Sequence, residues 1–228
     1  MALRGSLRTA SFAPLFVYLA VSAGAAAQTL PILQGEFWVE LEPLVGIEGG
    51  NPETDEEQIE LLLGEAQMVF SGMVYGFEFR YVPSDLRREV AEEFDLDLLA
   101  EIPWGDASLS VAQSRYQSGR RYVLIRYFVS EVQGSWVRFW DSNTHPTSTA
   151  IGEGNLFRGR DEKLTAIRNG VKEAIRAYTR TRVYTKPREI SGLAAFASVP
   201  YVVIDEGTYR AKVEVKLDIR EVLPYKVY

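Results

Sequence analysis

The first long helical pattern in the chain covers about residues 55–73. Apolar residues recur there at steps of three and four, which places them on one face of a helix. Thr54 and Glu57 form a capping-box pattern before this run, and Gly72 and Gly76 mark its end. The residues expected on the buried face are Ile59, Leu62, Leu63, Ala66, Val69, Phe70 and Met73.

A second long helix is predicted from Asp161 to about Arg182, because Pro187 prevents it from running on. Ser84 and Asp85 predict the start of a third, shorter helix that reaches Phe94. The expected buried stripe of the long helix is Leu164, Ile167, Val171, Ala174, Ile175 and Tyr178, and its expected outer, basic face is Lys163, Arg168, Lys172, Arg176 and Arg180.

Alternation with a period of two predicts strands elsewhere. It is clearest from Tyr209 to Glu221, where apolar side chains alternate with charged ones. An extended run from Ile190 to Ile204 precedes it, and the turn residues 205–208 between the two predict a long hairpin. Shorter strands are predicted near residues 37–41 and 77–81.

Residues 108–140 predict three antiparallel strands joined by short turns. The middle strand, residues 122–129, is apolar on both faces apart from Arg126, so we expect it to be central. In the third strand, Trp136, Arg138 and Trp140 have the same parity and would share one face. A polar loop is expected from residue 141 to residue 159.

About seven strands and three helices, with short turns between adjacent strands, favour an α+β fold. We expect an antiparallel sheet of about six to seven strands with three helices packed mainly on one face. No repeat or linker divides the chain, so residues 28–228 are predicted to form a single α+β domain. The long helix followed by a long hairpin, residues 161–221, resembles the layout of small envelope modules such as the N-terminal domain of flagellar assembly protein T. This resemblance carries over no functional residue.

Residues 1–27 have the layout of a secretory signal peptide. Arg4 and Arg8 precede an uncharged, mostly apolar run from residue 13 to residue 27, which ends in the small-residue motif Ala25-Ala26-Ala27. The run falls short of the ~20 residues that a transmembrane helix needs. We therefore expect cleavage after Ala27, with Ala23 as the alternative, and no transmembrane span in the mature chain.

The chain contains no cysteine, which excludes disulfides, thiolate metal sites, a thiol nucleophile and a lipid attached at cysteine. Zero cysteine in an exported chain favours a bacterial periplasm or an extracellular location. The formal net charge of −6 becomes −8 when Arg4 and Arg8 leave with the signal peptide. An acidic, exported chain makes nucleic acid an unsuitable partner.

Common catalytic motifs of hydrolases and nucleotide enzymes are absent from the sequence. Residues 152–154, Gly-Glu-Gly, lack the third glycine of a dinucleotide fingerprint and indicate a flexible loop. His145 is the only histidine, so a site with two imidazoles cannot form within one chain. It could act as a lone base beside Asp141, but its place before Pro146 indicates a solvated turn. We predict no metal and no cofactor, and assign no catalytic residue.

Charge is distributed unevenly along the chain. Residues 28–79 contain eleven acidic and no basic side chains, whereas residues 158–188 contain ten basic and three acidic ones. Three interpretations stay open: a solvated face, pairing of the basic helix with the acidic first helix, or a site for an anionic polymer or lipid headgroup. The candidate binding residues of this face are Arg168, Lys172, Arg176 and Arg180.

The second candidate surface is the predicted aromatic strand with Trp136, Arg138 and Trp140. Its large side chains either belong to the core or form an exposed platform on which a sugar ring or a partner side chain could stack.

The export signal, the charge asymmetry and the missing motifs predict a non-catalytic cell-envelope protein that binds another envelope component or assembles with itself. Its oligomeric state is not predicted. The alternative is a carboxylate-dependent hydrolase of cell-wall or extracellular glycans, since such enzymes have little linear signature. Two carboxylates in a cleft beside Trp136 or Trp140 would favour this enzyme. The candidate pairs are Asp95 with Asp97, Asp205 with Glu206, and Asp141 with Glu153.

Overall fold

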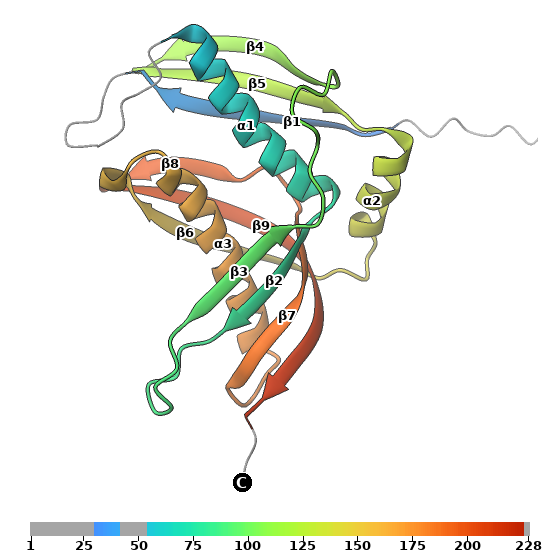
Figure 1. Cartoon of the computed structure of the whole chain (residues 1–228), viewed down its shortest axis with the longest axis vertical. Coiled ribbons are helices and arrows are strands. Elements are labelled where there is room, and N and C mark those ends of the chain that lie inside the picture. Colours follow the sequence, from blue (N-terminus) through green and yellow to red (C-terminus); the bar gives the residue numbers. More distant parts are fainter. Residues whose placement is uncertain (1–29, 42–53, 226–228) are drawn as a thin grey trace, which may run out of the picture.

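The computed structural model describes residues 30–41 and 54–225 (Figure 1). In this part of the chain, three α-helices combine with antiparallel sheets of three and six strands, which confirms the predicted α+β class. The helices are α1 (Asp55–Val74), α2 (Glu131–Asp141) and α3 (Asp161–Arg180), and the strands are β1 (Ile32–Glu40), β2 (Phe77–Val82), β3 (Glu93–Leu98), β4 (Leu109–Gln117), β5 (Arg120–Phe128), β6 (Thr147–Asn155), β7 (Pro187–Phe196), β8 (Tyr201–Asp205) and β9 (Thr208–Pro224).

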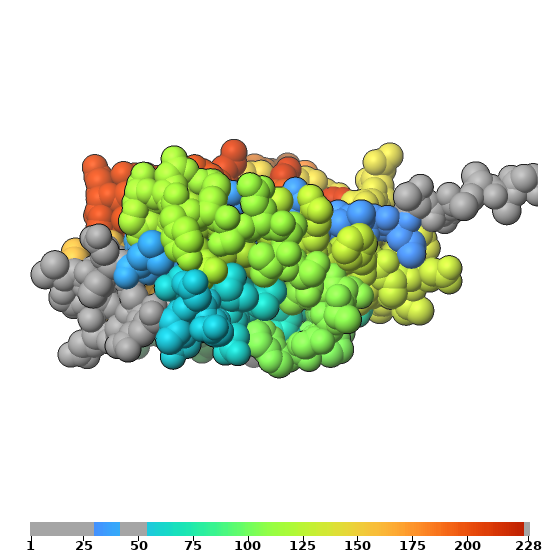
Figure 2. All heavy atoms as spheres, turned by 90° about the horizontal axis from the view of Figure 1, so that it is seen from above, coloured from blue at the N-terminus to red at the C-terminus, as the bar shows by residue number. Residues whose placement is uncertain are grey.

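The small sheet has the order β1-β5-β4, so the segment predicted to be a central strand, β5, is central. Helix α1 lies against this sheet (Figure 1). It begins with the predicted capping box, in which Glu57 N donates to Thr54 Oγ1 at 3.2 Å and Thr54 N donates to Glu57 Oε2 at 3.1 Å. Seen from the end of the molecule, β4 and β5 cover much of this face with α1 beside them (Figure 2).

The large sheet has the order β3-β2-β7-β9-β6, and β8 also pairs with β9. The extended run predicted from Ile190 to Ile204 is divided into two strands, β7 and β8, and both pair antiparallel with β9. The predicted hairpin is thus present as β8 and β9. Helix α3 packs against β6 and β9 (Figure 1). Residues 147–155, expected within a polar loop, are strand β6. Gly152 is required there because an added Cβ would lie 2.0 Å from Gly170 N of α3. Residues 152–154 thus allow close helix–sheet packing, and the prediction of a flexible loop was wrong.

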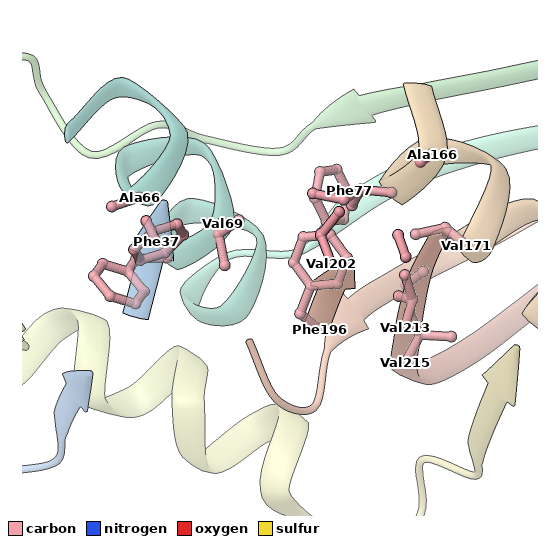
Figure 3. Close-up of a cluster of buried hydrophobic side chains, with 14 of the residues drawn as sticks. Phe37, Ala66, Val69, Phe77, Ala166, Val171, Phe196, Val202, Val213 and Val215 are labelled. Carbon is pink, nitrogen blue, oxygen red and sulfur yellow. The ribbon is translucent and has the colours of Figure 1, made fainter. Parts of the chain in front are cut away.

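The hydrophobic core extends across both sheets. Figure 3 shows Phe37, Ala66 and Val69 of the small-sheet half and Phe77, Phe196 and Val213 of the large-sheet half in one view of this cluster. The indole of Trp38 in β1 links the halves, since its Nε1 donates to Val202 O of β8 at 3.1 Å. Burial of these apolar side chains supplies the main driving force for joining the two halves.

Residues 131–141 form helix α2, so the predicted third strand of the meander was wrong. Aromatic and β-branched residues favour strands, but Ser130 and Gln133 form a capping box that starts a helix. The short helix predicted after Ser84 was also wrong. There the Asp85 carboxylate accepts from Arg87 N at 3.0 Å and closes a turn, and Leu86 is 94% exposed.

Within residues 30–41 and 54–225, none of the helices combines the length and apolar character needed to cross a membrane. The predicted signal peptide, and the acidic residues Glu42, Glu48 and Glu53, lie outside the described residues.

Candidate functional site

The three residues of the predicted aromatic surface do not share a face. Trp140 is only 2% exposed, and its Nε1 donates to Tyr75 O at 3.2 Å. Trp136 is 41% exposed, and Arg138 is exposed as well. Residues two positions apart lie on different sides of a helix, so Arg138 is separated from both tryptophans on α2, and of the tryptophans only Trp136 is exposed. The structure therefore does not form the Trp-Arg-Trp platform.

The four residues of the predicted basic face divide into two pairs. Arg168 Nη2 donates to Phe94 O at 2.7 Å, and Lys172 Nζ forms an ion pair with Glu92 at 2.7 Å. These two side chains thus attach α3 to Phe94 of β3 and to Glu92, the residue that precedes β3. The predicted pairing with the acidic first helix is present in Lys163, which bonds to Glu65 of α1 at 2.8 Å.

Arg176 and Arg180 instead line a cavity of about 310 Å³ at the end of α3, which we call the basic cavity. Its walls come from β2, the last turn of α3, and the chain that leads into β7. Its lining residues are Tyr81, Pro83, Ser84, Glu92, Arg176, Thr179, Arg180, Val183, Lys186, Pro187 and Ile190.

Basic side chains outnumber acidic ones in this lining. Arg176 reaches Glu173 at 3.4 Å, whereas Arg180 and Lys186 form no hydrogen bond or ion pair with any residue that the structure describes. The acidic residue of the lining, Glu92, already has Lys172 as its counter-ion. The cavity therefore has an excess of positive charge that attracts an anionic group.

The polar groups opposite these bases have fixed protonation at neutral pH. Burial raises the pKa of the Glu92 carboxyl, but hydrogen bonds from Lys172 and Tyr81 outweigh this and lower it below its ordinary value. Burial, and then the bond to Glu92, raises the pKa of the Tyr81 hydroxyl. Glu92 thus stays charged, and Tyr81 stays protonated and donates to Glu92 at 3.0 Å. Neither group offers a donor to an anion, so binding would fall to the basic side chains of the lining.

The acidic pairs considered for a hydrolase are held apart or exposed. Asp141 bonds to Lys216, and Glu153 pairs with Arg210. Lys216 and Arg210 are six positions apart on β9, which corresponds to roughly 20 Å along a strand. The two acids are therefore bound at separate points of β9, each by its own cation.

Two of the other candidate acids, Asp95 and Asp205, form surface ion pairs. Asp95 pairs with Arg80 at 3.2 Å, and Asp205 pairs with Arg210 at 2.6 Å. The ring of His145 packs against Phe139 at a centroid distance of 4.5 Å, so the proposed solvated turn is partly covered.

Tyr81 and Glu92 were not identified from the sequence, although they line the basic cavity with Lys186, which belongs to the basic segment 158–188. They are far apart along the chain and meet because β2 and β7 are neighbours in the large sheet. The sequence signal for this region was the basic segment with the candidate residues Arg176 and Arg180.

Comparisons with known proteins do not assign an activity. An uncharacterized protein of Treponema pallidum (strain Nichols) is 23% identical over 210 residues, which cover 91% of this chain and 85% of that protein. No solved structure matches the chain significantly. A protein-family model matches residues 21–225, and the chain therefore belongs to that family, whose function is uncharacterized.

Proposed function

We propose that this chain is an exported protein of the bacterial cell envelope that acts by binding another envelope component. In this proposal the basic cavity receives an anionic group of that component, such as a phosphate on a polymer or a lipid headgroup. The observation that carries the proposal is the pair of basic side chains, Arg180 and Lys186, that line this cavity without any ion pair among the described residues.

The location outside the cytoplasm is supported by the signal-peptide pattern of residues 1–27 and by the absence of cysteine. The bacterial origin of the Treponema relative is consistent with it. Expression with the full leader and mass measurement of the product tests this part. The expected product begins at Gln28, and a cytoplasmic product that keeps residues 1–27 would contradict export.

Binding of an anionic group can be measured with glycerol phosphate, a small probe that has the phosphate of many envelope components. Titration followed by two-dimensional NMR should shift the backbone amides around Arg176, Arg180 and Lys186. Because ionic attraction is screened by salt, the affinity should fall as salt is raised. Arg180→Glu should weaken binding by about tenfold or more, since a charged hydrogen bond contributes ~1.5–3 kcal/mol.

Arg126→Glu is the matched control. Arg126 lies on β5 of the other sheet and bonds to Gln34, so its reversal changes the net charge by the same amount away from the cavity. It should leave the affinity unchanged. Equal loss in both variants would show that net charge, and not the basic cavity, attracts the probe.

A further inference from the structure

The turn after β2 and the turn before β7 lie at the same end of the large sheet, because these two strands are antiparallel neighbours (Figure 1). We call this part of the molecule the basic end and define it as residues 84–89 and 180–188. Residues 84–88 and Lys186 line a cavity of about 430 Å³, so the two segments lie side by side. This cavity shares Ser84 and Lys186 with the basic cavity, and the two therefore adjoin each other.

Two large side chains project from the basic end into solvent. Leu86 is 94% exposed and Tyr184 is fully exposed, and these are the highest fractions for a large apolar or aromatic side chain in the described part of the chain. A leucine gains free energy when it moves from water into an apolar phase. A tyrosine suits the boundary between a membrane and water, because its ring is apolar and its hydroxyl is polar. Both side chains are thus placed to enter a membrane surface.

Basic residues surround these two side chains. The basic end contains two acidic residues, Asp85 and Glu89, and six basic ones, which are Arg87, Arg88, Arg180, Arg182, Lys186 and Arg188. Asp85 is buried and forms an ion pair with Arg88 at 2.7 Å, so its charge is not presented to solvent, whereas Glu89 is exposed. Arg180 and Lys186, which have no ion pair among the described residues, add to the excess of positive charge. The surface around the projecting side chains is therefore positive.

We propose that the basic end docks the protein on a bilayer of anionic phospholipid. Leu86 and Tyr184 enter the boundary between headgroups and acyl chains, and the surrounding bases contact the headgroup phosphates. The projecting apolar groups favour a bilayer over a soluble anionic polymer, because a polymer of that kind offers charge but no apolar phase. This inference rests on the proposed function, since Arg180 and Lys186 contribute to both, and it names the bilayer as the envelope component.

Sedimentation of the purified mature protein with lipid vesicles tests the proposal. One set of vesicles contains phosphatidylcholine alone, and the other contains phosphatidylcholine with phosphatidylglycerol, which is anionic. The protein should bind the anionic vesicles at least about tenfold more tightly, because each basic residue near an anionic surface adds to the free energy of binding. High salt should release it. Equal binding to both sets, or binding to neither, would overturn the proposal.

The contribution of the projecting side chains is measured with two matched variants. Tyr184→Ala should weaken binding to the anionic vesicles by about tenfold, since a large side chain can no longer be buried in the bilayer. Tyr201→Ala is the control, because Tyr201 is also exposed but lies on β8, away from the basic end (Figure 1). It should bind as the unaltered protein does. The same affinity in both variants would show that Tyr184 does not enter the bilayer, and would contradict the proposed docking.

The orientation on the bilayer can be measured with a fluorescent label. The chain contains no cysteine, so a single introduced cysteine places an environment-sensitive dye at one position. When anionic vesicles are added, the emission of the dye in Leu86→Cys should shift to shorter wavelength, whereas that in Tyr201→Cys should stay the same. No shift in Leu86→Cys, or an equal shift in both, would contradict docking through the basic end.

The vesicle assay and the titration with glycerol phosphate separate this inference from the proposed function. Binding of glycerol phosphate without binding of vesicles would support the anion site in the basic cavity and overturn the bilayer as its source. Binding of anionic vesicles without any response to glycerol phosphate would support the bilayer and contradict a phosphate in the basic cavity.

Discussion

At the scale of single residues, small side chains set how closely α3 approaches the large sheet. An added Cβ at Gly152 would lie 2.0 Å from Gly170 N and 2.2 Å from Ala166 O, and both of these are backbone atoms that cannot rotate away. The helix would have to move away from β6, which loosens the apolar contacts around it.

Gly152→Ala should therefore lower the free energy of unfolding by about 3 kcal/mol, the upper part of the range for overpacking. Gly64→Ala is the control, because Gly64 is inside α1 and the nearest atom to its added Cβ is 3.8 Å away. Alanine should leave stability unchanged or raise it by up to ~1 kcal/mol. Urea unfolding of both variants makes the comparison, and similar values for the two would contradict the packing argument.

The buried Glu40 carboxyl makes a specific contribution to the pH dependence of stability. Burial raises its pKa above the ordinary 4.5, and Arg120, the Tyr209 hydroxyl and Lys163 offset only part of this. Just above pH 4.5 the folded protein then binds more protons at this site than the unfolded chain does. The contribution of Glu40 to stability consequently falls as the pH rises through this window.

Glu40→Gln removes this titration. We compare the free energy of unfolding of the variant with that of the unaltered protein. The variant's value minus the unaltered protein's value should become more positive as the pH is raised from about 4 to about 7. Urea unfolding across this pH range measures the difference. The contributions of the other titrating groups cancel in it, because both proteins contain these groups. A difference that is constant with pH would show that Glu40 has an ordinary pKa in the folded protein.

At the scale of elements, the long amphipathic patterns predicted the right helices and strand, although in α3 Lys163, expected outside, is 7% exposed and Leu164, expected to be buried, is 42% exposed. In α1, Leu62, Ala66 and Phe70 are buried as predicted, and in β9 Val213 and Val215 are buried. Such segments are predictable because one periodicity is repeated over many residues and each repeat adds to the same face.

Short elements were harder to predict because composition and local signals disagreed. In α2, the aromatic residues favoured a strand, while the Ser130 and Gln133 capping box indicated a helix. In β6, Gly152 and Gly154 suggested a loop, because the helix backbone that requires them is contributed by a distant segment. The basic cavity depends on tertiary packing in the same way, because Tyr81, Glu92 and Lys186 come from separate segments of the chain.

The orientation of α2 predicts opposite results for its two tryptophans. Trp140 packs against Leu193 and Ala195, so Trp140→Ala should cost about 3–5 kcal/mol of stability. Trp136 is 41% exposed, so Trp136→Ala should cost less than ~1 kcal/mol. Thermal unfolding of the two variants checks this, and equal losses would indicate that both side chains share one buried face, as in the strand first predicted.

At the scale of the whole molecule, a buried ion pair helps to join the two halves. The Lys163 and Glu65 side chains are each 9% exposed, and Lys163 also bonds to Trp38 O of β1. This lysine of α3 therefore contacts both α1 and the small sheet. Because both charges are buried, removal of either one alone leaves an uncompensated charge.

Lys163→Met should lower the free energy of unfolding by about 3–5 kcal/mol. The double variant Lys163→Met with Glu65→Leu should recover much of this loss, since no buried charge is left unpaired. Urea unfolding of the two single variants and the double variant gives the coupling energy. A single variant that costs less than ~1 kcal/mol would indicate that water reaches the pair.

The central functional claim is that the protein holds an envelope component through an anionic group in the basic cavity. Retention on washed bacterial envelopes, measured at low and high salt, tests this most directly. The unaltered protein and Arg126→Glu should be retained at low salt and released at high salt, whereas Arg180→Glu with Lys186→Glu should be released at both. Retention of that double variant equal to the unaltered protein would contradict the claim.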